Sequence, residues 1–219
     1  MFAAPAILLE LSAVYGSETN TSTVFALAPV VTILAWGVTS DMPVTMRLLV
    51  PALSGVAGVL LLLSFEAPIS VHGGVALAEA AVAMLFVSVA SVQLHRLLQG
   101  VDVAITLGVA CAVNALVLLG WGSSRRELVW HGWSMGLLAA VFIGAIGIGF
   151  TIWLLREMDV VRFSTRFFVI PLVTILEGLA LVRPELTWRL FAGVGLLLVA
   201  SVWLLRAETQ VDDEVLSLR

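Results

Sequence analysis

The chain has 219 residues, of which 61% are apolar and 12% charged, with a net charge of −4 and a mean hydropathy of +1.11. Soluble domains have about 45 to 50% apolar and about 25% charged residues, so this composition excludes a soluble domain, and the single cysteine, Cys111, excludes an intrachain disulfide. The pI of about 5.3 excludes a basic surface for nucleic acid, and we predict an integral membrane protein.

The predicted elements are apolar segments long enough to cross a bilayer as helices, which takes about 17 to 25 residues. The first, at residues 2–15, is too short to cross, and its Glu10 and lack of a basic start argue against a signal peptide. Full spans follow at residues 22–40, 45–64, 73–95, 101–121, 132–155, 164–182 and 187–205. The predicted fold class is an all-α, polytopic membrane helix bundle with about seven full spans and a partial N-terminal one.

The arginines predict the orientation of these spans. Seven of them fall on the side of the N-terminus, and four, Arg125, Arg126, Arg183 and Arg189, fall on the opposite side. Because basic residues concentrate on the cytoplasmic side, we predict that both termini are cytoplasmic. We expect a multi-pass protein of the plasma membrane, in bacteria the inner membrane.

An internal repeat is the most informative feature of the sequence. Residues 22–34 read STVFALAPVVTIL and residues 164–176 read STRFFVIPLVTIL, with eight of thirteen positions identical at an offset of 142. The register continues without a gap, since Thr45 and Arg47 fall on Thr187 and Arg189. The second copy starts five spans after the first, so the copies cross the bilayer in opposite directions. Inverted repeats of this kind are typical of transporters that work by alternating access.

The repeated block resembles the drug/metabolite transporter superfamily with its EamA domain. The resemblance lies in P-x-V-T-I-L followed by a polar stretch and a glycine-containing apolar helix, in PLVTILEGLALVRPELTWRLFAGVGLLLVASVWLL and, more weakly, in PVVTILAWGVTSDMPVTMRLLVPALSGVAGVLLLL. It implies ten helices in two inverted five-helix repeats. It also implies transport of small metabolites, such as amino acids, related metabolites or drugs, without ATP hydrolysis and with export as the expected direction.

The repeat also predicts how the chain is divided. We predict the C-terminal part of a first EamA-like repeat at 1–71, a second repeat at 72–206 and a cytoplasmic tail at 207–219. A full first copy would begin about 65 residues before Met1, which we attribute to a start codon assigned too late. A gene fragment, a non-functional truncated transporter and an accessory membrane subunit stay open. An intramembrane enzyme is a less favoured alternative, because no HExxH or GxSxG motif is present.

Three carboxylates fall inside predicted spans, where a charge costs about 2.5 to 3.5 kcal/mol on insertion scales and needs a partner or water. Glu10, Glu79 and Glu177 lie at similar depth in the outer half of the predicted bundle. We predict that they line an outward vestibule that binds a cationic or zwitterionic substrate, or a proton. The alternative is that each reaches the membrane surface or pairs with a neighbouring arginine.

Four further residues complete the predicted site. Asn114 and Thr151 are weaker candidates for substrate binding, since a hydrogen bond to a neighbouring helix would also satisfy a polar group within a span. Pro29 and Pro171 occupy the same position in the two copies, so we predict helix breaks that serve gating, with a packing kink as the alternative. We predict no catalytic residue, metal site, cofactor or nucleic-acid partner. The predicted partners are the lipid bilayer and a small-molecule substrate, with proton coupling and a homodimer as open options.

Overall fold

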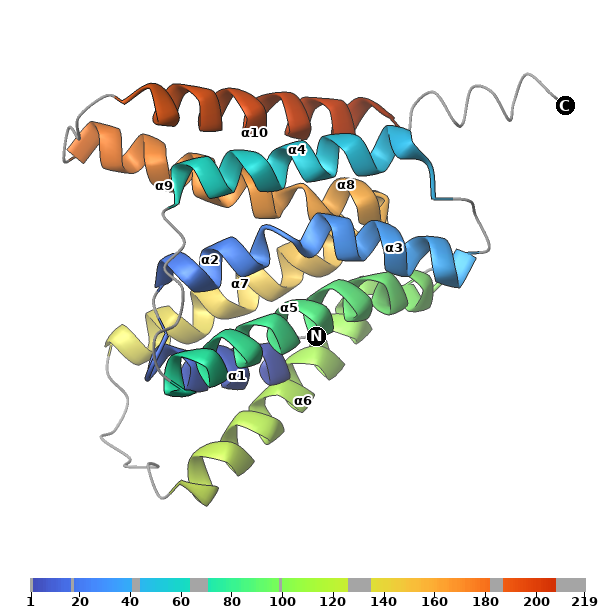
Figure 1. The fold of residues 1–219 in the computed structure, drawn as a ribbon. Helices are drawn as coiled ribbons and strands as arrows, with labels where there is room; N and C mark the ends of the chain where they lie inside the picture. The colour runs from blue at the N-terminus through green and yellow to red at the C-terminus, as the bar shows by residue number, and fades with distance from the viewer. Residues whose placement is uncertain are drawn as a thin grey trace, which may run out of the picture.

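The computed structural model describes residues 2–16, 18–40, 44–63, 71–98, 100–125, 135–181 and 187–207. Within these ranges the chain forms ten α-helices and no strand (Figure 1). The prediction of an all-α membrane helix bundle is therefore confirmed, while the number of spans stays a prediction. The helices are α1 (Ala3–Ala13), α2 (Glu18–Phe25), α3 (Ala28–Ser40), α4 (Met46–Leu62), α5 (Val71–Leu98), α6 (Val103–Ser124), α7 (Met135–Glu157), α8 (Val160–Ser164), α9 (Arg166–Leu181) and α10 (Trp188–Ala207).

Four helical segments of the described chain are long and apolar enough to cross a membrane. They are Asn20–Thr39, which joins α2 and α3, then α5, α6 and the segment Trp188–Arg206 of α10. Helix α6 has no buried residue, and its exposed surface is rich in Ile, Leu and Val. An apolar helix without a buried face fits a lipid environment, because lipid chains are as apolar as the side chains they contact.

The helix breaks lie at different positions in the two copies of the repeat. In the first copy α2 ends at Phe25, and Pro29 is the second residue of α3, where its missing N–H costs no helical hydrogen bond. In the second copy the break is at Thr165, and Pro171 lies inside α9. A proline deprives the carbonyl four residues earlier of its helical donor. This applies to Pro171, which leaves the carbonyl of Phe167 within α9 without its helical donor.

Helices α4 and α10 form the most extensive helix pair of the bundle, and they run in opposite directions (Figure 1). They begin 142 residues apart, at Met46 and Trp188. Their backbones approach so closely that a Cβ atom built on Gly58 would lie 2.9 Å from the carbonyl oxygen of Gly193. Small residues at such a crossing allow the close van der Waals contact that holds helices together in a membrane.

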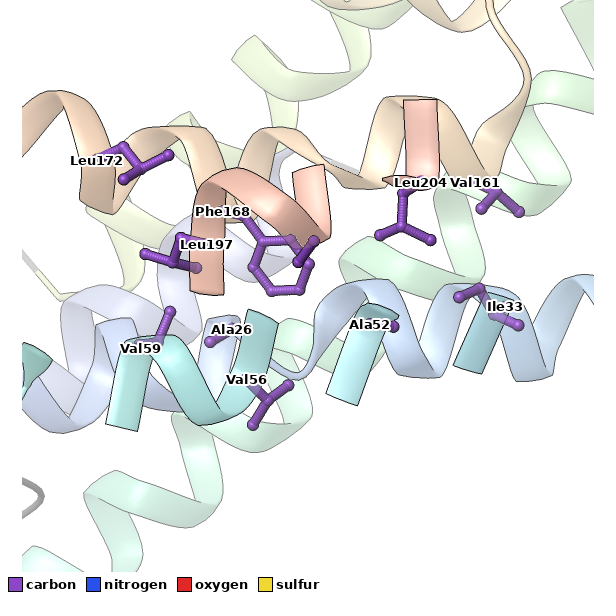
Figure 2. Packing of buried hydrophobic residues seen from close by; sticks show 11 residues of the cluster. Ala26, Ile33, Ala52, Val56, Val59, Val161, Phe168, Leu172, Leu197 and Leu204 are labelled. Carbon is purple, nitrogen blue, oxygen red and sulfur yellow. The ribbon is translucent and has the colours of Figure 1, made fainter. Parts of the chain in front are cut away.

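The largest cluster of buried apolar residues joins α3, α4, α9 and α10. Figure 2 shows the ring of Phe168 inside this cluster, with Leu197 of α10, residues of α4, and Ala26 from the break between α2 and α3. The ring is fully buried, and a Cβ atom built on Gly55 would lie 2.5 Å from its Cζ. Gly55 therefore provides the space that the ring of Phe168 fills.

Helix α5 connects the remaining elements, since it packs against α1, α2, α3, α7 and α8. The hydroxyl of Ser12 on α1 donates a hydrogen bond to the carbonyl of Ala76 at 3.0 Å, and that of Ser88 donates to Ala28 at 3.4 Å. Both serines are buried. Interhelical hydrogen bonds of this kind contribute to helix association in membranes. In this conformation one hydrogen bond joins α5 to α1 and another joins α5 to α3.

Candidate functional site

A cavity of about 310 Å³ lies between α1, α2, the end of α4, and α9. The residues that line it are Leu9, Thr21, Ser22, Phe25, Leu63, Phe167, Ile170 and Pro171. Its volume lies at the lower end of the range of small-molecule sites, about 300 to 1,000 Å³. Thr21 is near the start of α2 and Leu63 directly follows α4, so the cavity lies toward the end of the bundle where α2 begins and α4 ends.

The two copies of the repeated motif meet at this cavity through a pair of aromatic rings. The ring centroids of Phe25 and Phe167 lie 5.8 Å apart, and the planes are tilted by 42°. Aromatic pairs favour separations of about 4.5 to 7 Å. The two residues occupy the same position in the repeat, 142 residues apart. A residue that contacts its own equivalent lies where two copies of a structure meet, so the cavity is built at the junction of the copies.

The described wall of the cavity is mostly apolar. Its polar side chains are Thr21 and Ser22, which are adjacent on α2. None of the described lining residues carries a charge. A positive charge lies against one ring of the wall. The guanidinium carbon of Arg166 lies 4.8 Å from the ring centre of Phe167 and 3.8 Å from that of Phe163. The positive charge thus stacks on aromatic rings, an arrangement that suits guanidinium groups.

A second, much smaller cavity lies beside the first, between α1, α2 and α5. Its volume is about 10 Å³, and its polar lining residues include Ser12, Asn20 and Thr21. This volume is about the minimum that a water molecule needs. Thr21 lines both cavities, so the small polar cavity and the larger apolar one share a wall.

At the opposite end of the bundle, the last turns of α5 contact α3 and α7. Nδ1 of His95 donates to the carbonyl oxygen of Leu155 on α7 at 2.6 Å, and the His95 ring meets Trp36 of α3 edge-on at 5.8 Å. The guanidinium of Arg96 lies 5.6 Å from the Trp36 ring centre and donates to the carbonyl of Thr39. We call these five residues the α5 latch. It joins α3 of the first copy to α5 and α7 of the second.

The three predicted carboxylates are not among the described residues that line the larger cavity. Glu10 is exposed on α1, directly after the lining residue Leu9. Glu79 is half-buried on α5, where its neighbour Ala80 lines the small polar cavity. Glu177 belongs to α9, but its side chain lies outside the described part of the structure. Their role as a vestibule stays a prediction.

The other predicted residues also have defined positions. Asn114 is half-buried on α6, and its Nδ2 donates to the carbonyl of Ala110 one turn earlier at 2.8 Å. Thr151 is half-buried on α7, and neither residue is among the described lining of the cavity. Pro171 lines the cavity, whereas Pro29 is buried in α3.

Sequence reasoning missed most residues of the cavity wall. Ser22, Phe25 and Phe167 were distinguished in the sequence only as identical positions of the repeat. Ile170 lies in the second copy at a position that differs between the copies, and Thr21 lies just before the first copy. One signal could have identified the aromatic pair: both copies have phenylalanine at this position. Most other apolar positions of the motif can exchange one apolar residue for another. Thr21 and Ile170 carried no comparable signal.

Comparisons with known proteins identify the family and the fold of the chain. The sequence profile of the EamA-like transporter family matches residues 74–206. No curated protein matches the chain. A solved structure, titled only "Crystal structure of protein", has the same fold with a TM-score of 0.74 and 19% identity, over 93% of this chain and 74% of that chain. The chain belongs to the EamA-like transporter family of the drug/metabolite transporter superfamily and is a multi-pass membrane protein.

Proposed function

We propose that the chain is a secondary transporter that exports small metabolites by alternating access. The observation that carries the proposal is the cavity at the junction of the two motif copies, which lies toward one end of the bundle, while the contacts of the α5 latch join α3, α5 and α7 at the other. A transporter of this kind needs a site that is open to one side of the membrane at a time. With the orientation predicted from the arginines, the cavity lies in the outer half of a plasma-membrane protein whose termini are cytoplasmic.

The repeat supports this mechanism, because an inverted pair can exchange the conformations of its two halves. Helices α4 and α10 run antiparallel, as an inverted pair requires. In the proposed cycle the α5 latch opens when the cavity end closes. Phe25 and Phe167 then separate or repack, since each belongs to a different half of the molecule and both contribute to the cavity wall.

Among the predicted carboxylates, Glu79 is the best candidate for proton coupling. It is half-buried on α5, the helix that carries the latch at its far end, and the next residue, Ala80, lines the small polar cavity that shares Thr21 with the substrate cavity. A carboxylate within a membrane span is costly and usually functional. Protonation of Glu79 would remove that charge and so change the relative stability of the two states. Glu177, on α9 of the same predicted repeat, is proposed as a second carboxylate for proton coupling.

A reversible cross-link across the latch tests alternating access directly. In a Cys111→Ser background, cysteines in place of Thr39 and Arg96 would be joined by a short bis-methanethiosulfonate reagent, which replaces the span that the Arg96 side chain bridges to the Thr39 carbonyl. We expect the cross-linked double variant, reconstituted in liposomes, to lose uptake of every compound that the uncross-linked protein carries in a panel of radiolabelled amino acids and drugs, and to recover it after reduction. The two single-cysteine variants are the controls. Unchanged transport in the fully cross-linked protein would contradict the proposal.

A further inference from the structure

The cavity wall also limits the chemistry of the substrate, an inference that rests on the proposed transport function. We propose that the cavity takes an uncharged molecule with an aromatic body and one hydrogen-bonding group, and that it discriminates against organic cations. The argument depends on the composition of the described wall, on the geometry of its two rings and on the position of Arg166.

The shape and composition of the wall favour a flat apolar body. Four aliphatic side chains, those of Leu9, Leu63, Ile170 and Pro171, surround the Phe25 and Phe167 rings. The tilt of 42° between the rings leaves them as two inclined surfaces of the same wall. An aromatic group can contact such rings in an offset or edge-on arrangement, which is favoured over exact face-to-face stacking.

The polar groups of the described wall lie at one corner. Thr21 and Ser22 are consecutive on α2, and each hydroxyl can both donate and accept a hydrogen bond. One hydroxyl, carbonyl or amide group on the substrate can therefore pair with this corner. A substrate with several polar groups would leave some of them against aliphatic side chains, where an unpaired polar group is costly.

The charges near the wall disfavour a cation. A charged ligand would lose its hydration in a mostly apolar cavity, and no described lining residue supplies an opposite charge. Phenylalanine rings can attract organic cations, but Phe167 already has the guanidinium of Arg166 at 4.8 Å from its ring centre. A second cation at Phe167 would meet the repulsion of this fixed positive charge.

Three naphthalene probes with the same ring test the inference: 2-naphthylmethanol, 2-naphthoate and 2-naphthylmethylammonium. Their binding to the purified full chain in nanodiscs of uncharged lipid is measured at pH 7 by equilibrium dialysis, with protein-free nanodiscs subtracted. We expect the alcohol to bind at least about tenfold more tightly than either ion. Tighter binding of the ammonium compound, or of the carboxylate, would overturn the proposal.

Variants locate the binding. Ile170→Trp fills the cavity and should abolish binding of the alcohol, whereas Val173→Trp adds the same side chain to an exposed position of α9 outside the described cavity wall and should leave it unchanged. Ser22→Ala removes the hydroxyl of the other polar residue of the wall, so affinity should fall about fivefold, the contribution of one hydrogen bond. Equal effects of the two tryptophan variants, or full affinity of Ser22→Ala, would contradict the assigned site.

The outcomes for the ligand class and for transport can be told apart. If the alcohol binds with the expected variant pattern but transport survives a complete cross-link of the α5 latch, the ligand class holds and the proposed transport cycle is wrong. If the cross-link blocks transport but the ammonium compound binds more tightly than the alcohol, the transport cycle holds and the ligand class is wrong.

Discussion

The contact between Gly55 and Phe168 makes a quantitative prediction about packing. In Gly55→Ala the new methyl carbon would lie 2.5 Å from Cζ of Phe168, 2.6 Å from Cε2 and 2.9 Å from Cε1. The ring cannot move away easily, because Phe168 is fully buried among residues of α4 and α10. We expect Gly55→Ala to lower the free energy of unfolding by about 1 to 3 kcal/mol, the usual cost of overpacking.

When the ring of Phe168 is absent, Gly55→Ala should no longer destabilise the protein. Phe168→Ala alone should cost about 3 to 5 kcal/mol, as for other large-to-small changes at buried phenylalanines. In the double variant the methyl group that Gly55→Ala introduces enters space that the ring has vacated. The double variant should therefore be no less stable than Phe168→Ala alone, which gives a coupling energy of about 1 to 3 kcal/mol between the two positions.

Equilibrium unfolding of the purified protein in mixed micelles measures all three variants. Gly195→Ala is the matched control, because a Cβ atom at Gly195 meets open space and the change should only add the helix propensity of alanine, about 1 kcal/mol at most. Additive losses in the double variant would refute the assigned contact, since they would mean that the methyl group and the ring do not compete for the same space.

Three further predictions concern other contacts. Gly58→Ala should weaken the α4–α10 pair by about 1 to 3 kcal/mol, because the obstructing atom is the backbone oxygen of Gly193 at 2.9 Å, and micellar unfolding measures the loss. Ser12→Ala should cost about 0.5 to 1.5 kcal/mol in the same assay, because it removes the interhelical hydrogen bond that the Ser12 hydroxyl donates to the carbonyl of Ala76. Glu79→Gln should abolish transport driven by a pH gradient while retaining exchange of substrate between the two sides, measured in liposomes.

The predictions for Gly58 and Glu79 have matched controls. Gly195→Ala places the same methyl group on α10 in open space and should not destabilise the pair. Glu10→Gln makes the same change at an exposed carboxylate, and we expect it to retain gradient-driven transport. Loss of gradient-driven transport in both glutamine variants would contradict the separate role given to Glu79. A Ser12→Ala protein as stable as the wild type would show that the buried hydrogen bond contributes nothing net.

The general architecture could be predicted from sequence because it depends on local properties. The length and apolarity of each segment predicted helices at the positions of α3 to α7, α9 and α10. The residues that are identical in the two copies of the repeat predicted that these copies occupy equivalent places in the fold. The break at Thr165 could not be predicted, since the sequence signal there was Pro171, six residues further on. A proline constrains its own turn, whereas the position at which a helix ends also depends on its tertiary neighbours.

The candidate site was less accessible to prediction, and Glu10 shows why. The cost of a carboxylate in a span made Glu10 a site candidate, but a sequence does not reveal which neighbours surround each face of a helix. In the structure its neighbour Leu9 lines the cavity, while Glu10 itself is exposed. The wall consists instead of ordinary residues such as Phe25 and Ile170, whose importance follows only from their positions in space.

The glycine contact between α4 and α10 has a consequence for the proposed transport cycle. The backbones of α4 and α10 touch at Gly58 and Gly193, and sliding of one helix past the other would break this contact. We therefore expect α4 and α10 to keep their relative position while the other helices move. The moving parts would then be α3 and α5, which the latch joins through side chains that can separate. Spin labels on α4 and α10 should accordingly report one distance throughout the cycle, and labels on α3 and α5 should report two.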